Sequence, residues 1–284
     1  IQQAIEAAAA GPVVLPRREG RPLLAQAIPL RDAALDRSQT LRDAVRAAPR
    51  FGRIVSEALL LVAAYRIHAL TRGAADSARQ RLDQEGARRV HDLCADLRGG
   101  VLKLGQLASA RIDLLPEAYA ASLGRLQDRV PPVPFEAIRN EIETALGAPL
   151  SALFESVERT PLAAASLAQV HGAVLPGGAR VALKVLVPGI EEVVETDLAA
   201  LRVVAPALRE VWPGADLETL TRELGRSLRE ELDLSREAGN AARFARECAG
   251  DDGVVVPRVH AERSAGRVLC LERIDGQRLP DWLA

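Results

Sequence analysis

The chain has 284 residues, of which 48% are hydrophobic and 26% are charged, a composition typical of globular proteins with a core of their own. Aromatic residues make up only 3%, so aliphatic side chains must supply that core, and a mainly helical protein is expected. The net charge is −1, and basic residues are not interleaved with aromatic ones, which argues against a nucleic-acid partner.

The charge is unevenly distributed along the chain. Residues 1–125 carry nineteen basic and thirteen acidic side chains, and the remainder carries eighteen basic and twenty-five acidic ones. A basic first part suits an anionic membrane surface or an acidic partner, and it suits a solvated, arginine-rich helix face equally well. The three cysteines, Cys94, Cys248 and Cys270, lack metal-ligand spacing and are expected to be free thiols in a reducing compartment, so no metal site is predicted.

No segment is expected to cross a membrane. The most apolar run, Ile54 to Leu70, contains Glu57, Arg66 and His68 and is shorter than a bilayer crossing requires. We therefore expect a cytoplasmic protein, peripheral at the inner face of a bacterial membrane if it binds one. Because the chain begins with Ile1 and contains no methionine, it is expected to be a piece of a longer protein.

The first half of the chain is expected to be helical beyond a loose start. Prolines 12, 16, 22, 29 and 49 are expected to break any long helix over residues 1–50, which leaves short helical pieces. Apolar spacing predicts one helix over 51–70 and one amphipathic helix over 78–110. Gly99, Gly100 and Gly105 lie inside the second, each at a cost of about 1 kcal/mol relative to alanine, so a close backbone approach is expected there.

Shorter elements follow in the middle of the chain. Helices are expected from 117 to about 127, over 135–146 with a stop at Gly147, and over 151–156. Apolar residues between Pro161 and Val187 flank Pro176-Gly177-Gly178, and this pattern predicts two strands joined by a tight turn. Helices over 190–211 and 217–249, separated by Trp212-Pro213-Gly214, and strands over 254–261 and 267–274 complete the chain.

The basic residues contain an anomaly. Of the 37 lysines and arginines, only Lys103 and Lys184 are lysines. A compact ammonium suits a phosphate or a buried carboxylate, where the planar, bulkier guanidinium would need different geometry. The alternative interpretation is that these two lysines remain by chance and that neither has a specific function.

The second predicted strand of the hairpin carries Lys184 in a recognisable pattern. A strand, a small-residue turn, a second strand, and a lysine on a third strand before a carboxylate-rich helix form the layout of a protein-kinase N-lobe. Val181-Ala182-Leu183-Lys184 fits the kinase pattern V-A-x-K. Where kinases place the glycine-rich loop over the phosphates, this chain has Ala163-Ala164-Ala165-Ser166, whose methyl groups stiffen the loop and occupy space.

Several motifs in order resemble the UbiB/AarF/ADCK atypical protein-kinase-like family of coenzyme Q biology. They are Lys103-x-Gly105-Gln106 with Asp113-Leu114-Leu115-Pro116, the run Leu126 to Pro132, the run Ala163 to His171, the V-A-x-K match, Glu231-x-Asp233 with Glu237 and Asn240, and Leu271-Glu272-x-x-x-Gly276. The resemblance covers residues 97–284. Each motif alone is weak, and their joint order is specific.

The resemblance implies roles for these residues. Lys184 resembles the phosphate-contacting lysine, Glu237 resembles its helix partner, and Lys103 is implied to pair with Glu231 across the nucleotide pocket. The full implied set consists of Ala163, Ala164, Ala165, Ser166, Ala182, Lys184, Glu237 and Glu272 at the nucleotide, and Lys103, Gly105, Gln106, Glu231 and Asp233 in the motif across it. The implied cofactor is ATP or ADP with Mg²⁺.

Helical periodicity disagrees with the motif at one position. On a straight helix Glu230, Asp233 and Glu237 share a face, and Glu231 points about 100° or more away. A helix break near Leu232, or a role for Glu230, would remove the conflict. A solvated helix face is the alternative interpretation of the acidic cluster, but a phosphate-site lysine needs a carboxylate partner on a neighbouring helix.

The expected fold is α+β and mainly helical. An N-terminal extension over 1–85 and a helical extension over 86–158 are expected to precede a kinase-like N-lobe over 159–284. The family's catalytic and metal-binding residues are expected beyond Ala284, so no catalytic residue and no Mg²⁺ ligand is predicted here.

Two functions remain open. The first is the ATP-binding part of an atypical kinase or ATPase that supports isoprenoid quinone synthesis or lipid homeostasis, with the Lys103 helix capping the groove where a peptide would enter. The alternative is a catalytically silent, pseudokinase-like scaffold that binds a lipid, such as an isoprenoid quinone, or a pathway partner at an anionic membrane surface.

Overall fold

A computed structural model describes residues 14–15, 23–24, 30–71, 76–109, 115–126, 130–209, 211–212, 216–251 and 253–276. The chain divides into two compact units, residues 1–49 and 50–284. In the first unit, β1 (Val14–Leu15) pairs antiparallel with β2 (Leu23–Leu24). The second unit contains all the side chains considered below.

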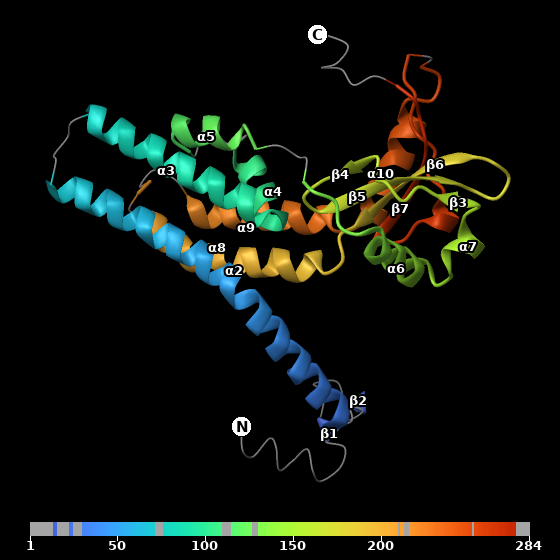
Figure 1. The fold of residues 1–284 in the computed structure, drawn as a ribbon, viewed down its shortest axis with the longest axis horizontal. Helices are drawn as coiled ribbons and strands as arrows, with labels where there is room; N and C mark the ends of the chain where they lie inside the picture. Colours follow the sequence, from blue (N-terminus) through green and yellow to red (C-terminus); the bar gives the residue numbers. More distant parts are fainter. Residues whose placement is uncertain are drawn as a thin grey trace. The chain divides into compact units, whose positions relative to one another are not determined.

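The second unit combines a helical part with a small sheet (Figure 1). The helices are α2 (Leu30–Thr71, which begins in the first unit), α3 (Asp76–Leu97), α4 (Gly99–Ser109), α5 (Glu117–Leu123), α6 (Phe135–Leu146), α7 (Leu150–Leu153), α8 (Ile190–Leu208), α9 (Leu217–Glu231) and α10 (Leu234–Glu247), with the 3-10 turn η1 (Ala261–Arg263). The strands are β3 (Ser156–Val157), β4 (Ala163–Ala164), β5 (Ala168–Val174), β6 (Arg180–Leu186) and β7 (Val268–Glu272). The predicted α+β, mainly helical class is confirmed.

The sheet is antiparallel and runs in the order β3-β5-β6-β7, with β4 also paired to β5. The turn between β5 and β6 contains Gly177 at φ 100° and Gly178 at φ 86°, a backbone region that side chains disfavour. The predicted hairpin is therefore confirmed. In its register Lys184 lies opposite Val170 on β5 and opposite Leu269 on β7.

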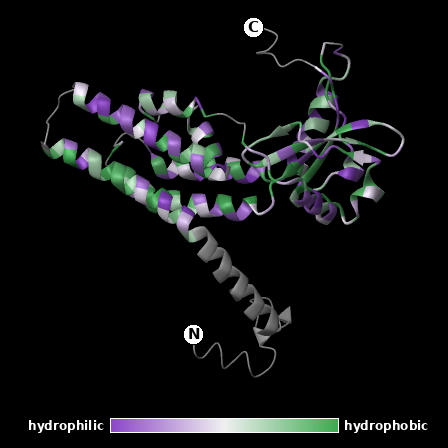
Figure 2. Cartoon of the chain, viewed as in Figure 1, coloured by the Kyte–Doolittle hydropathy of each residue, from purple (hydrophilic) through white to green (hydrophobic). Residues whose placement is uncertain are grey.

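Alternation along β6 separates the two faces of the sheet. Val181, Leu183 and Val185 are fully buried against α6, whose Ile138 and Ile142 are fully buried too. Figure 2 shows the strands mostly hydrophobic. Successive strand residues point to opposite faces, so Ala182, Lys184 and Leu186 lie on the other face, where Leu186 packs in one cluster with residues of α4, α8, α9 and α10.

The expected single helix over 78–110 is wrong. Arg98 has φ 56° and Gly99 has φ 58°, and this left-handed step separates α3 from α4. The close approach expected of the glycines is confirmed, because a Cβ on Gly100 would lie 2.7 Å from Asp197 Oδ2 and one on Gly105 would lie 2.9 Å from Leu126 Cδ1.

A buried ion pair explains why the chain turns at Arg98. Arg50 donates from Nε to Asp197 Oδ1 at 2.5 Å and from Nη2 to Oδ2 at 2.8 Å. The same guanidinium donates to the carbonyls of Leu97 and Arg98 at 2.7 and 2.8 Å, and Asp197 accepts from the Val101 N–H at 2.8 Å. The pair thus satisfies the free carbonyls at the end of α3 and a free N–H at the start of α4.

Asp197 is completely buried. Burial pushes the pKa of its carboxyl above the usual value, and the Arg50 guanidinium and the Val101 N–H oppose that rise.

Some predicted element boundaries are also corrected. α2 continues through Pro49, so the break expected there is wrong, and the other four prolines lie outside the described residues. α5 ends at Leu123, short of the predicted limit, and α7 ends at Leu153. Among the described residues no helix combines the length and apolar content that a membrane crossing requires.

The predicted stop of α6 is confirmed, because Gly147 adopts φ 70°. The strand expected over 254–261 is wrong. Only an isolated bridge between Val259 and Leu271 forms there, and η1 follows.

Candidate functional site

Lys184 forms an ion pair with Glu237 on the face of the sheet opposite α6. The distance from Lys184 Nζ to Glu237 Oε2 is 2.5 Å. β6 supplies the lysine and the first turn of α10 supplies the glutamate, and α10 is held against the sheet by Leu234, which is 1% exposed. The two side chains remain 34% and 44% exposed, so the pair is accessible to a ligand.

Lys103 forms a second pair nearby in the fold. Its Nζ lies 3.1 Å from Glu231 Oε2, with the two side chains 26% and 40% exposed. Lys103 belongs to α4, and Glu231 is the last residue of α9. The pairings implied for both lysines are therefore present.

Glu231 and Glu237, the partners of the two lysines, lie on either side of a helix break. The single helix expected over 217–249 is wrong, since α9 ends at Glu231 and α10 begins at Leu234. The break near Leu232, predicted as one way to turn Glu231 toward Lys103, is confirmed. Asp233 caps α10 by accepting a hydrogen bond from the Ser235 N–H at 3.1 Å, which gives this residue a structural role at the break.

The alanine segment is part strand and part turn. Ala163 and Ala164 form β4 and pair with Val170 and Gln169 of β5. The Ala165 N–H donates to the Ala168 carbonyl at 2.8 Å and closes the turn, in which Ser166 is 8% exposed. Since Ala163 lies opposite Val170 and Val170 opposite Lys184, the segment is two strands away from the lysine.

The segment Leu271–Gly276 begins on β7, next to the strand that carries Lys184. Leu271 lies opposite Ala182 in the sheet, and β7 ends at Glu272. Glu272 Oε2 accepts a hydrogen bond from the Arg258 N–H at 3.3 Å.

An ion pair that the sequence did not suggest lies on the sheet face that carries Ala182 and Lys184. Glu158 and Arg273 are 2.8 Å apart, and a Cβ on Gly172, opposite Ala182, would overlap the Glu158 carboxylate at 2.3 Å. Only the strand pairing brings Glu158 to this face, so the sequence alone carried no signal for it.

Other motif residues have structural contacts. Gln169, 2% exposed, accepts from the Val133 N–H at 2.5 Å and donates to the Val133 carbonyl at 3.4 Å. His171 Nδ1 lies 2.8 Å from the Glu158 carbonyl oxygen. Gln106 donates to the Leu126 carbonyl at 3.4 Å. These contacts anchor the proline-rich segment to the sheet and α4 to the segment after α5.

A lysine on a middle strand, paired with a glutamate on the helix that packs on the sheet, defines a protein-kinase-like N-lobe. Residues 125–284 match the model of the ABC1 atypical kinase-like domain. The chain therefore belongs to the ABC1 atypical kinase-like family, and the resemblance to UbiB-type proteins inferred from the motifs is confirmed.

Relatives share this family across bacteria and plants. A "Probable protein kinase UbiB" of Marinobacter nauticus is 42% identical over 183 residues, which are 63% of this chain and 34% of that protein. A protein of the same description from Xanthomonas campestris pv. campestris is 37% identical over 254 residues, 82% of this chain and 44% of that protein. The chloroplastic "Protein ACTIVITY OF BC1 COMPLEX KINASE 7" of Arabidopsis thaliana is 40% identical over 180 residues, 63% of this chain and 26% of that protein.

The chain thus spans less than half the length of these relatives. A solved structure of Rv3197 from Mycobacterium tuberculosis in complex with erythromycin is also similar, with a TM-score of 0.47 and 31% identity, over 72% of this chain and 52% of that one.

Proposed function

We propose that this chain is the ATP-binding part of a UbiB-type atypical kinase or ATPase. One observation carries the proposal, namely the 2.5 Å contact between Lys184 Nζ and Glu237 Oε2 on the face of the sheet opposite α6, where both side chains are partly exposed. In kinases a lysine on this strand holds the nucleotide phosphates and a helix glutamate positions it. A point-charge ammonium is the appropriate group for that role, which accounts for a lysine in a chain otherwise rich in arginine.

The surrounding residues fit a nucleotide. Lys184 would hold phosphate oxygens, the Ala163–Ser166 segment would lie over them, and Leu271–Gly276, with Glu272, would lie beside the base. The Ala165 N–H already donates to Ala168, so it is not available to a phosphate. The lysines would consequently contribute more to phosphate binding here than in a kinase with a glycine-rich loop.

Mg²⁺ would neutralise phosphate charge during transfer. No group of three or more His, Cys, Asp or Glu side chains within the described ranges could hold a metal ion. We place the Mg²⁺ ligands and the catalytic residues in the remainder of the protein, as in kinases generally.

The biological context follows from the relatives. Their description as UbiB supports a role in isoprenoid quinone synthesis. We propose that the protein acts in the cytoplasm or at the inner face of a bacterial membrane. We infer that the helix of Lys103 caps the groove where a peptide would enter, and a small molecule or lipid is therefore favoured over a peptide as phosphoryl acceptor.

A scaffold at the membrane surface is the second candidate. Four large apolar side chains of α2 are exposed, namely Leu59 (53%), Leu60 (52%), Ile67 (61%) and Leu70 (86%), and they favour contact with a lipid surface. Salt-sensitive binding to anionic liposomes, with no ATP hydrolysis by the complete protein, would favour the scaffold over the enzyme.

Nucleotide binding is tested by thermal unfolding of the full-length protein. We expect ADP, or a non-hydrolysable ATP analogue, with Mg²⁺ to raise the melting temperature, because a ligand that binds only the folded state at 100 times its Kd adds about 2.7 kcal/mol of stability. GTP at the same concentration is the control for nonspecific anion effects. No shift with any adenine nucleotide, with or without Mg²⁺ or Mn²⁺, would refute the proposal.

A further inference from the structure

The Glu158–Arg273 ion pair crosses the sheet on the face that carries Lys184. Glu158 follows β3 at one edge of the sheet, and its N–H donates to the Gly172 carbonyl of β5 at 2.8 Å. Arg273 follows β7 at the opposite edge, and its N–H donates to the Arg180 carbonyl of β6 at 3.1 Å. The arginine side chain therefore crosses β6 and lies over β5, where its Nη1 is 2.8 Å from Glu158 Oε1.

Gly172 makes room for this pair. A Cβ on Gly172 would lie 2.3 Å from Glu158 Oε1 and 2.8 Å from Arg273 Nη1, so both charged groups lie directly over the glycine backbone. Directly opposite residues of paired strands point to the same face, and Gly172 is opposite Ala182, so any side chain at position 172 would enter the face that carries Lys184. The glycine thus lets the ion pair lie against the sheet itself.

The Arg273 guanidinium is held in one orientation. Besides its contact with Glu158, its Nε lies 3.8 Å from Asp275 Oδ1, and the arginine side chain is 27% exposed, against 51% for Glu158. Asp275 also pairs with Arg180. A guanidinium with a carboxylate on either side has less freedom to lose when a ligand binds, so this group is preorganised.

Ala182 connects the pair to the proposed nucleotide site. Across the sheet, Ala182 has Gly172 on one side and Leu271 on the other. Lys184, which would hold the phosphates, lies two residues further along β6, about 7 Å away. The base would lie beside Ala182 and the segment that begins at Leu271, so the ion pair over Gly172 lies at the base end of the site.

We propose that Arg273 binds the nucleoside part of the nucleotide, with its planar guanidinium stacked on the base, and that Glu158 is the positioning residue that holds the guanidinium there. This inference rests on the proposed nucleotide site and adds a contact to it. Nucleobases stack on guanidinium planes, which an ammonium group cannot imitate. One face of the sheet therefore carries two kinds of cation, a point charge for the phosphates and a plane for the base.

Two ligands of the full-length protein separate the base from the phosphates. ADP contains both parts, and pyrophosphate, measured with Mg²⁺ by competition with ADP, contains phosphates alone. We expect Arg273→Ala to weaken ADP about three- to tenfold and to change pyrophosphate affinity less than about twofold. Lys184→Ala should weaken both ligands.

An arginine beside Glu158 supplies the matched control. The Arg159 guanidinium lies 4.8 Å from the centroid of the Phe135 ring of α6, which packs on the opposite face of the sheet. Arg159→Ala removes the same charge as Arg273→Ala and should leave the affinities for ADP and pyrophosphate unchanged.

A second variant displaces the pair without removing a charge. Gly172→Ala adds a methyl group where the Glu158 carboxylate and the Arg273 guanidinium lie. Both groups are the ends of flexible side chains and can move aside, so the variant should fold, which thermal unfolding verifies. It should weaken ADP about threefold or more without an effect on pyrophosphate. Gly52→Ala, whose added Cβ has no atom within 4 Å, is the control and should change neither affinity.

The positioning role of Glu158 has its own test. Glu158→Gln keeps a hydrogen-bond acceptor for Arg273 and should weaken ADP less than Glu158→Ala does, and neither variant should affect pyrophosphate.

The proposal is overturned if neither Arg273→Ala nor Gly172→Ala weakens ADP. It is also overturned if either variant weakens pyrophosphate as much as ADP, because the contact would then not be to the base. Failure of this proposal alone leaves Lys184→Ala weakening ADP, whereas failure of the nucleotide site itself means that the unaltered protein does not bind ADP.

Discussion

Replacing Asp197 with alanine is expected to lower the free energy of unfolding by about 3–5 kcal/mol. The carboxylate is fully buried and takes two hydrogen bonds from Arg50 and one from the Val101 N–H. Its removal leaves Arg50, 18% exposed, without its counter-charge and leaves the start of α4 with a free buried donor. Chemical denaturation of the unaltered chain and of the Asp197→Ala variant measures this loss in the free energy of unfolding.

The same helix supplies a matched control. Glu195, two residues before Asp197 on α8, accepts from Arg229 Nε and Nη2 at 2.6 and 2.9 Å, but the two side chains are 51% and 46% exposed. Glu195→Ala should therefore cost less than about 1 kcal/mol. Equal losses for the two variants would show that the buried pair does not hold α3, α4 and α8 together.

Lys184→Ala is expected to weaken adenine-nucleotide binding to the full-length protein by about 10- to 100-fold, because it removes a charge-assisted hydrogen bond to phosphate. The Lys184–Glu237 pair is partly exposed, so the ligand-free protein should lose less than about 1 kcal/mol of stability. Titration calorimetry and ligand-free melting, measured on the same variant, separate the two effects.

Two further variants sharpen that result. Glu237→Gln keeps a hydrogen-bond acceptor beside Lys184 and should cost less affinity than Lys184→Ala. Arg243→Ala removes an exposed basic side chain of α10, paired with Glu247 at 3.6 Å, and should leave affinity unchanged. Equal weakening by Arg243→Ala and Lys184→Ala would indicate a general charge effect and no specific phosphate contact.

The sequence was informative where local chemistry decides the structure. The Gly177-Gly178 turn needs positive φ at both residues, and Gly147 stops α6 in the left-handed conformation, so both features follow from residue type. Lys184 and Glu237 were paired through the family resemblance, and a break near Leu232, one of the two ways to resolve the conflict over Glu231, is confirmed.

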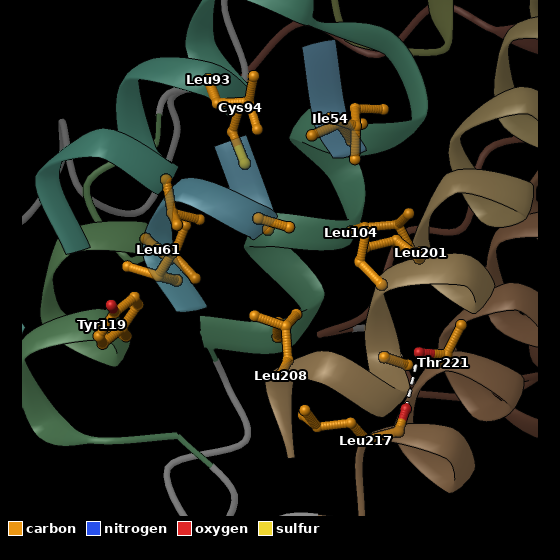
Figure 3. A pocket seen from close by; sticks show the side chains of 18 of the residues that line it. Ile54, Leu61, Leu93, Cys94, Leu104, Tyr119, Leu201, Leu208, Leu217 and Thr221 are labelled. Atoms are coloured by element: carbon orange, nitrogen blue, oxygen red, sulfur yellow. Dashed lines mark hydrogen bonds between the residues drawn. The ribbon is translucent and has the colours of Figure 1, made fainter. Parts of the chain in front are cut away.

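Features that depend on long-range contacts could not be predicted. Arg98 takes a positive φ because Arg50 and Asp197, 147 residues apart, hold both helix ends at that step. Val254–Ala261 has a strand-like pattern, but in this region only Val259 bridges to Leu271. The apolar pocket between α2, α3, α4, α5, α8 and α9 (Figure 3) could not be predicted either, because apolar spacing shows which face of a helix is buried and does not show whether the space between helices is filled.

The central claim is that Lys103 and Lys184 face one nucleotide site, and an acyl-phosphate derivative of ATP tests it most directly. Such a reagent transfers its acyl group to a lysine amine near the bound phosphates and releases ATP. In this stretch only Lys103 and Lys184 can be labelled on a side-chain amine, so mass spectrometry of the full-length protein assigns the sites without ambiguity. We predict acylation of both lysines that excess ATP suppresses, whereas labelling of neither lysine, or labelling that excess ATP does not reduce, would contradict the claim.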